Sequence, residues 1–140
     1  MSIFIDSGIF IAFSNKRDVN HEKARVLIKR VAKKEFGSPI TSDYVFDEVI
    51  TTTFIRTKRI ELAIKIGNLI LGKDPKIPKF IKLINVSENI FLKAWDIFKK
   101  YEPKNLSFTD ATIISMMENY KIVKLCSFDE NFDGIVGRVF

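Results

Sequence analysis

Histidine and cysteine are almost absent from this sequence, which contains one of each, His21 and Cys126. A single cysteine cannot form an internal disulfide, and its position in an apolar run indicates a core thiol in a reducing cytosol. His21 stands beside charged residues at an expected helix start, which favours a solvated side chain. The sequence therefore lacks the material for a histidine-rich zinc site or for Ser-His-Asp catalysis.

Long hydrophobic runs are missing as well. No segment approaches the roughly 18 consecutive apolar residues that a membrane-spanning helix needs. The amino-terminal segment carries an acidic residue, Asp6, where a secretion signal would carry basic ones. We therefore expect a soluble, cytoplasmic protein that is neither exported nor bound to a membrane.

The composition suits one compact domain with a basic surface. The chain has 140 residues, of which 46% are hydrophobic and 29% charged, and this length allows one sizeable core but not two ordinary ones. We expect a single domain over residues 1–140. Lys and Arg number 23 against 17 Asp and Glu, a formal net charge of +6, which favours polyanions such as nucleic acid or an acidic protein partner.

Apolar runs typical of strands alternate with segments of helical periodicity. Strands are predicted at residues 2–5, 80–86 and 121–128, and helices at 8–13, 20–36, 42–56, 60–71 and 87–100, with a further helix starting at Ser107 or Thr109. Asn20, Ser42 and Ser87 are expected as helix N-caps, whereas residues 39–41 are too few to predict a strand. The alternation predicts an α/β fold with a central parallel sheet flanked by helices.

Two segments imitate nucleotide and calcium motifs and then depart from them. Residues 67–73 match most of a P-loop, but Asp74 stands where a Ser or Thr is required, and the segment lies inside a predicted helix. Residues 129–134 match the start of an EF-hand loop, yet the twelfth position, which requires a glutamate, is Phe140. We expect neither a P-loop nor an EF-hand.

Acidic residues fall where such a sheet would gather them. Asp6 and Asp129 directly follow strand-like runs, and Asp110 lies in the first turn of a predicted helix, so all three belong to the sheet edge where α/β proteins bind ligands. Each also has a structural interpretation, as a turn, a helix-dipole contact or an Asx-turn. Crowded carboxylates repel one another, and a bound Mg²⁺ or Mn²⁺ would offset that repulsion. On the helix 42–56, the pattern leaves both Asp47 and Glu48 exposed.

Four segments together give the sequence a family likeness: IFIDSGIFIAF, SDYVFDEVITT, LSFTDATIISMMENY and IVKLCSFDENFDGI. In spacing and hydrophobic frame the chain resembles the PIN-domain nucleases, and among them the VapC-like toxins of toxin–antitoxin pairs. The resemblance implies a PIN-like α/β/α sandwich. It also matches Asp6, Glu48, Asp110 and Asp129 to the family's acidic metal-binding residues, and so selects Glu48 over Asp47.

The activity that the resemblance implies is hydrolysis of RNA phosphodiester bonds by a water activated by Mg²⁺ or Mn²⁺. Asp6 and Asp110 are the expected metal ligands, Asp129 would complete the shell or a second metal position, and Glu48 would position the attacking water. A cognate antitoxin and a homodimeric state are implied in the same way. The alternatives are a housekeeping PIN-type RNA-processing nuclease and a catalytically silent protein-binding PIN module. A phosphatase-type α/β domain would need a second acid where Gly8 stands.

Several further residues have two open interpretations. Ser7 and Thr109 could orient the neighbouring carboxylates or serve only as turn and cap, and Asp133 is either an additional acid or an Asx-turn before Gly134. Basic residues that could steer RNA are Lys16, Arg17, Arg56, Lys58 and Arg59. The helix pair 42–71 carries apolar residues beyond its inward stripe, namely Phe54, Ile55, Ile60 and Leu69, which a dimer or a partner helix would cover. Within it, Ala63, Ile64, Gly67 and Ile70 are predicted to face inward.

Overall fold

The computed structural model describes all residues from 1 to 140 and contains one five-stranded parallel sheet. The strands are β1 (Ser2–Ile5), β2 (Ser38–Ser42), β3 (Lys82–Ile84), β4 (Lys124–Cys126) and β5 (Gly137–Val139). They lie in the order β3-β2-β1-β4-β5, and every neighbouring pair is parallel. The predicted α/β fold with a central parallel sheet is confirmed.

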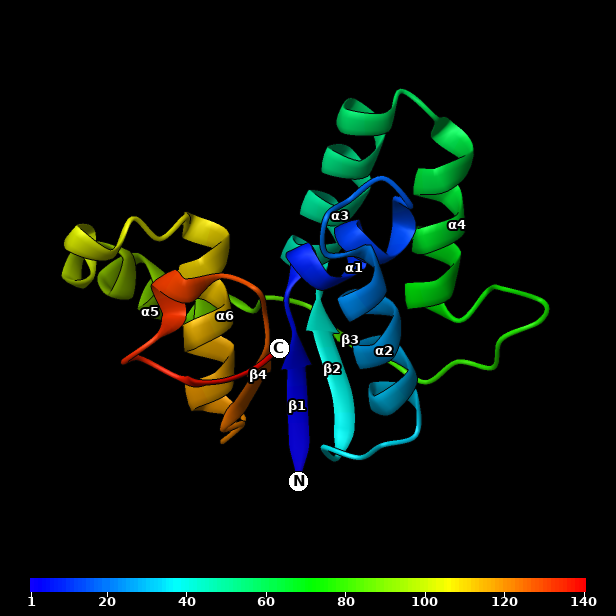
Figure 1. The fold of residues 1–140 in the computed structure, drawn as a ribbon. Coiled ribbons are helices and arrows are strands. Elements are labelled where there is room, and N and C mark those ends of the chain that lie inside the picture. Colours follow the sequence, from blue (N-terminus) through cyan, green and yellow to red (C-terminus); the bar gives the residue numbers. More distant parts are fainter.

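Six α-helices connect the strands: α1 (Ser7–Ser14), α2 (His21–Ala32), α3 (Asp43–Thr57), α4 (Ile60–Leu71), α5 (Glu88–Lys100) and α6 (Phe108–Asn119). Two short 3₁₀ helices, η1 (Glu102–Lys104) and η2 (Glu130–Phe132), lie in loops. Figure 1 shows α5 and α6 together on one side of the sheet and α1 and α2 on the other. The helix pair α3 and α4 extends beyond the carboxyl ends of the strands.

The core is centred on β1, the middle strand. Ile3, Phe4 and Ile5 are each 0% exposed, as expected for a parallel strand that helices cover on both faces. They belong to a cluster of 29 buried residues that includes Cys126. Burial raises the pKa of the Cys126 thiol to about 12, and the nearby charge of Asp6 adds to the effect. The thiol therefore stays protonated, and its predicted core role is confirmed.

Most helix boundaries follow the local signals in the sequence. The Ser42 and Ser87 side chains accept hydrogen bonds from Val45 N and Ile90 N at the starts of α3 and α5, as N-caps do. Helix α4 covers the predicted residues 60–71 and ends at Gly72, whose φ of +72° is left-handed. This placement also confirms that residues 67–73 do not form a P-loop.

Helix α2 begins where predicted, with Asn20 in the N-cap position, but it lacks the capping bond and ends early. The Asn20 side chain makes no capping bond, because the turn before the helix is organised by Asp18, whose side chain accepts from Asn20 N. The helix ends four residues before residue 36, and Lys34 then adopts a left-handed φ of 60°. At Gly37, φ is +96° and a Cβ would lie 2.3 Å from the carbonyl oxygen of Met1, so a glycine is required where the chain turns into β2.

Two expectations about the helix pair are corrected. Ile64 is 55% exposed, and Ile66, at 2%, takes the inward position. Leu69 is 6% exposed and packs in the core, so it needs no partner. Phe54, at 44%, and Ile60, at 53%, remain exposed as expected. None of the helices is both long enough and apolar enough to cross a bilayer.

Candidate active site

Asp6 lies at the carboxyl end of the central strand and is fixed on both carboxylate oxygens. Its Oδ1 accepts from Ser7 N at 2.8 Å, and its Oδ2 accepts from Ser127 Oγ at 2.6 Å. The pairing of Ile5 with Cys126 in adjacent strands brings residues 6 and 127 together. Asp6 is only 5% exposed, so this carboxylate is held inside the sheet edge.

Glu48 reaches the same edge from α3. Ser7 Oγ donates to Glu48 Oε1 at 2.7 Å and lies 3.5 Å from Asp6 Oδ1, so the serine links the two acids. Asp47 is exposed and faces Thr51, whose hydroxyl donates to it at 3.4 Å. The structure therefore directs Glu48 and not Asp47 to this edge, a distinction that helical periodicity could not make.

Asp110 enters from the amino-terminal end of α6. It forms a capping box with Ser107: its backbone N–H donates to Ser107 Oγ at 3.0 Å, and its Oδ2 accepts from Ser107 N at 2.9 Å. Ser107 is therefore the cap of this helix. Thr109 contributes only its carbonyl, which accepts from the Thr112 hydroxyl.

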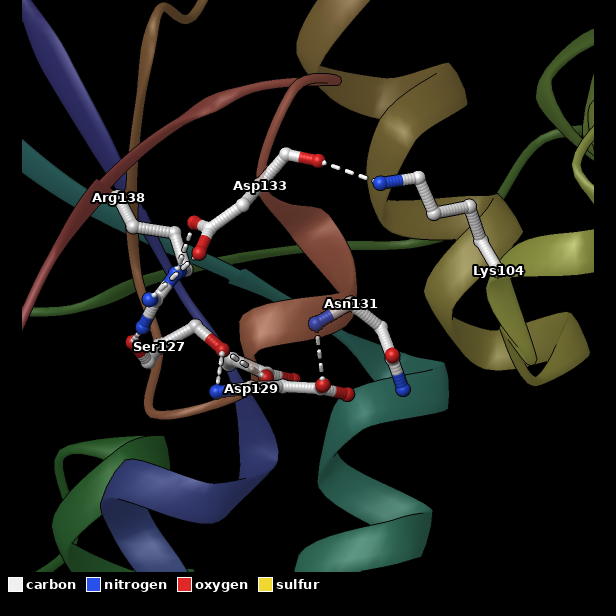
Figure 2. Close-up of polar contacts among 7 residues, drawn as sticks. Lys104, Ser127, Asp129, Asn131, Asp133 and Arg138 are labelled. Carbon is white, nitrogen blue, oxygen red and sulfur yellow. Dashed lines mark hydrogen bonds and ion pairs between the residues drawn. The ribbon is translucent and has the colours of Figure 1, made fainter.

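Asp129 is positioned by Ser127, which sequence reasoning missed. Ser127 Oγ donates to Asp6 and accepts from Asp129 N at 3.0 Å. Asp129 Oδ1 accepts from Asn131 N at 2.9 Å (Figure 2). The bond from Asn131 N forms the Asx-turn that was one interpretation of Asp129, and the other carboxylate oxygen of Asp129 has no protein partner. Ser127 directly follows β4, and Asp6 directly follows the neighbouring strand β1. This matching position is the signal that could have revealed the bond between Ser127 and Asp6.

Asp133 lies outside this cluster. It pairs with Arg138 through two contacts of 2.6 and 3.1 Å, and Arg138 also donates to the Ser127 carbonyl at 3.0 Å (Figure 2). The Arg138 hydrogen bond lowers the pKa of the Asp133 carboxyl. Lys104 Nζ donates to the Asp133 carbonyl at 2.9 Å. The Asx-turn prediction is thus wrong, because the side chain braces the loop between β4 and β5 through an ion pair.

The four acids line a single open pocket of about 420 Å³. Its lining consists of Asp6, Ser7, Gly8, Ile11, Glu48, Thr52, Arg56, Asn105, Ser107, Asp110, Phe128 and Asp129. Asp6 directly precedes α1, Glu48 lies on α3, Asp110 lies on α6, and Asp129 lies in the loop after β4. The pocket lies at the carboxyl edge of the sheet, as expected for ligand sites in this fold class.

Burial and mutual repulsion oppose ionisation in this pocket. Desolvation raises the pKa of Asp6 to about 7, with smaller upward contributions from the charges of Asp110 and Glu48, although the Ser127 hydrogen bond lowers it. Desolvation likewise raises the pKa of Asp110 to about 6, with help from the charges of Asp129 and Glu48 and against the Ser107 backbone bond. A cation in the pocket would relieve both effects.

The donor set fits a hard divalent cation. Every acidic ligand candidate offers oxygen, and neither His21 nor Cys126 lines the pocket, which suits Mg²⁺ or Mn²⁺ and disfavours zinc. No three acidic, His or Cys side chains form a preassembled ligand cluster. Mg²⁺ keeps several of its waters and commonly binds through one or two carboxylates, so the open arrangement is compatible with it.

His21 has a structural role in place of the predicted solvated one. Its Nδ1 lies 2.9 Å from the Ala12 carbonyl, near the carboxyl end of α1. The ring therefore ties α2 to the helix that carries Ser7.

Comparisons with known proteins agree with this geometry. The family model of the PIN domain matches residues 3–137. The chain belongs to the PIN domain family. This PIN domain is 27% identical over 139 residues to a VapC ribonuclease of Archaeoglobus fulgidus, covering 94% of this chain and 80% of that protein.

Solved structures share the fold at lower identity. VapC20 of Mycobacterium tuberculosis, described as a toxin that cleaves the sarcin-ricin loop, superposes with a TM-score of 0.82 at 21% identity, over 98% of both chains. A chain of VapBC2 of Rickettsia felis, solved bound to a promoter DNA fragment, gives 0.71 at 16% identity over 99% of this chain and 98% of that one. A chain of a Klebsiella pneumoniae toxin–antitoxin complex gives 0.60 at 19%, over 99% and 96%. The PIN-like α/β/α sandwich is thereby confirmed.

Proposed function

We propose that this PIN domain is a ribonuclease that depends on Mg²⁺ or Mn²⁺ and acts as the toxin of a toxin–antitoxin pair, with residues 1–140 forming one functional unit. The observation that carries the proposal is the convergence of Asp6, Glu48, Asp110 and Asp129 on one open pocket at the carboxyl edge of the sheet. The relative in Archaeoglobus, which is named a VapC ribonuclease, supports the same activity.

Each acid has a role that follows from its surroundings. Asp6 and Asp110 are the proposed metal ligands, since their raised pKa values reflect charge that a cation would stabilise. Asp129 would complete the shell or a second metal position. The bound ion would lower the pKa of a coordinated water and neutralise charge on the scissile phosphate. Glu48, held by Ser7, would orient the attacking water.

The partners follow from the family relationship and the exposed apolar surface. Structures with the same fold include chains of VapBC and other toxin–antitoxin complexes, which supports a cognate antitoxin here. Phe54, Ile55 and Ile60 are 44%, 57% and 53% exposed on the protruding pair α3 and α4. Apolar side chains in that number favour a covered surface, and we assign it to a homodimer.

A housekeeping RNA-processing nuclease would use the same pocket and the same ion. It would lack the antitoxin, so a short neighbouring reading frame for a DNA-binding antitoxin separates the two functions. A catalytically silent protein-binding module would bind partners without cleaving RNA.

The decisive experiment compares RNA cleavage by native protein, Asp110→Asn and Asp47→Asn. Asparagine at position 110 keeps an oxygen for the Ser107 amide, so the helix cap survives while the charge is lost. We expect cleavage of a mixed RNA with Mg²⁺ or Mn²⁺ and none with EDTA. Asp110→Asn should lose on the order of 100-fold in rate, as enzymes do when one group that stabilises transition-state charge is removed. Asp47→Asn removes an exposed charge one residue from Glu48 and should cleave normally. Equal rates for native protein and Asp110→Asn would contradict the proposal.

A further inference from the structure

A second and larger cavity opens beside the acidic pocket. It measures about 850 Å³ and is lined by the carboxyl ends of α1 and α3, the loops that follow these two helices, the start of α2, and α4 with the loop after it. Arg56 lines both cavities. The two cavities are therefore adjacent, with Arg56 between them.

The larger cavity is strongly basic. Six cations line it, Lys16, Arg17, Arg25, Arg56, Arg59 and Lys65, against one carboxylate, Asp74. Two of the six have carboxylate partners: Arg25 contacts Glu22 at 3.4 Å and Arg59 contacts Glu61 at 2.6 Å.

The other four cations have no carboxylate within 4.0 Å. Four of the five residues that the sequence offered for steering RNA lie here, whereas Lys58 does not line the cavity. The fold places two further cations, Arg25 and Lys65, in the lining of the same cavity. Like charges gathered on a concave wall repel one another, and a polyanion would remove that repulsion.

Helix α3 supplies a track between the two cavities. Glu48, Thr52 and Arg56 stand four residues apart and all line the acidic pocket, so they form one stripe along the helix. The stripe rises about 12 Å from the acid to the arginine at 1.5 Å per residue. A strand whose phosphate sits at the acids can therefore continue past Thr52 to the cations.

We infer that this basic cleft binds the phosphates of the RNA strand on one side of the cleaved bond. The inference rests on the proposed ribonuclease function. The carboxylates of the acidic pocket repel the phosphates on either side of the cleaved bond, so cations beside the pocket would add affinity for RNA. The cleft provides such cations next to the acids, and Arg56 meets the strand as it leaves the pocket.

An acidic segment of a protein partner is the competing occupant of the cleft. Adjacency to the acidic pocket favours RNA, because a strand that is cleaved at the acids passes Arg56, which lines both cavities. The two occupants are separated by probing the same variants with RNA and with a polyglutamate peptide.

The test variant replaces three unpaired cations: Lys16→Gln, Arg17→Gln and Lys65→Gln. All three side chains are exposed, so the fold should be unaffected, and Arg56 is retained to leave the acidic pocket unchanged. The matched control also removes three charges, by Lys33→Gln, Lys82→Gln and Lys121→Asn. These exposed residues lie before or at the amino ends of β2, β3 and β4, at the opposite edge of the sheet, and asparagine suits the φ of 56° at position 121.

Binding of a labelled single-stranded RNA is measured by fluorescence anisotropy in EDTA, which prevents cleavage, at several salt concentrations. Each phosphate contact contributes about 0.7 to the slope of log affinity against log salt for single strands. The cleft variant should bind more weakly, with a slope shallower by about 2. The ratio of native to variant affinity for RNA should fall about 20-fold as the salt concentration rises from about 50 to 200 mM. The control variant should behave like native protein.

With Mg²⁺ present, the cleft variant should cleave this RNA with a raised KM and a nearly unchanged kcat. If native protein cleaves RNA and the cleft variant has the native RNA affinity and salt slope, the inference about the cleft is overturned. The proposed ribonuclease function would be unaffected by that result. A cleft variant that loses polyglutamate binding but binds RNA as well as native protein does would also overturn the inference. That result would assign the cleft to an acidic protein partner. Native protein that cleaves no RNA would instead contradict the ribonuclease, and absence of RNA binding by native protein in EDTA would refute the cleft's role.

Discussion

Replacing Asp6 with asparagine should stabilise the metal-free protein while abolishing its activity. Burial raises the pKa of Asp6 from about 3.8 to about 7, so the folded protein holds a proton that the unfolded chain has already released between these values. Stability is therefore lost as the pH rises from about 4 to 7, and the loss is complete above that range. Asparagine has no charge to lose and escapes this penalty.

The size of the effect follows from the shift and from the hydrogen bonds. A shift of about three pKa units corresponds to roughly 4 kcal/mol. Against this, an amide N–H₂ would face Ser127 Oγ, which already accepts from Asp129 N, and the hydroxyl would have to turn at a cost of about 1–2 kcal/mol. The net gain at pH 8 is about 2 kcal/mol, which corresponds to an increase in Tm of about 4–8 °C.

Thermal unfolding in EDTA, followed by circular dichroism from pH 5 to 8.5, checks this expectation. The difference in stability between Asp6→Asn and native protein should grow by about 1.4 kcal/mol per pH unit up to about pH 7 and then level off. Asp47→Asn, which changes an exposed acid, should follow native protein throughout. A difference that does not vary with pH, or a mutant less stable than native protein at pH 8, would show that the buried Asp6 charge does not destabilise the metal-free protein.

The metal site, the Ser127 bond and the exposed apolar surface can each be tested separately. Millimolar Mg²⁺ or Mn²⁺ should raise the Tm of native protein by mass action, and the increase should be smaller in Asp110→Asn; equal increases would argue against a site there. Ser127→Ala removes the hydroxyl bond that lowers the pKa of Asp6, so cleavage should fall more at pH 6 than at pH 8, and an unshifted pH profile would exclude this positioning role. Light scattering should give a dimer for native protein at micromolar concentration and a monomer for Phe54→Ser with Ile55→Ser; a monomeric native protein would contradict the dimer.

The features that the sequence predicted well are those set by local chemistry. Serine caps at Ser42 and Ser87, and a helix stop at Gly72, depend on residues within one turn and were found where expected. Strand β1 was recognisable because a middle strand of a parallel sheet is apolar on both faces. Strand β2 was not predicted, since Pro39 weakens the local signal and the strand forms through its neighbours β1 and β3.

The site was only partly accessible from the sequence. Asp6, Asp110 and Asp129 were visible as acids at strand ends and a helix start, whereas Glu48 was distinguished from Asp47 by family resemblance. The links made by Ser127 and by the Asp133–Arg138 pair depend on which segments meet after folding, and no spacing along the chain reveals them. The same holds for the basic cleft, whose cations come from four separate segments.

The central claim is that the clustered acids hold the divalent ion that drives RNA cleavage. It is tested most directly by measuring the rate of RNA cleavage against the amount of Mn²⁺ bound, with bound ion determined by electron paramagnetic resonance on the same samples. The native rate should rise with the amount of bound Mn²⁺, and Asp6→Asn should lose both binding and cleavage while Asp47→Asn keeps both. Cleavage by Asp6→Asn at the native rate, or cleavage by native protein in EDTA with no bound Mn²⁺, would contradict a role of the acids in holding the ion.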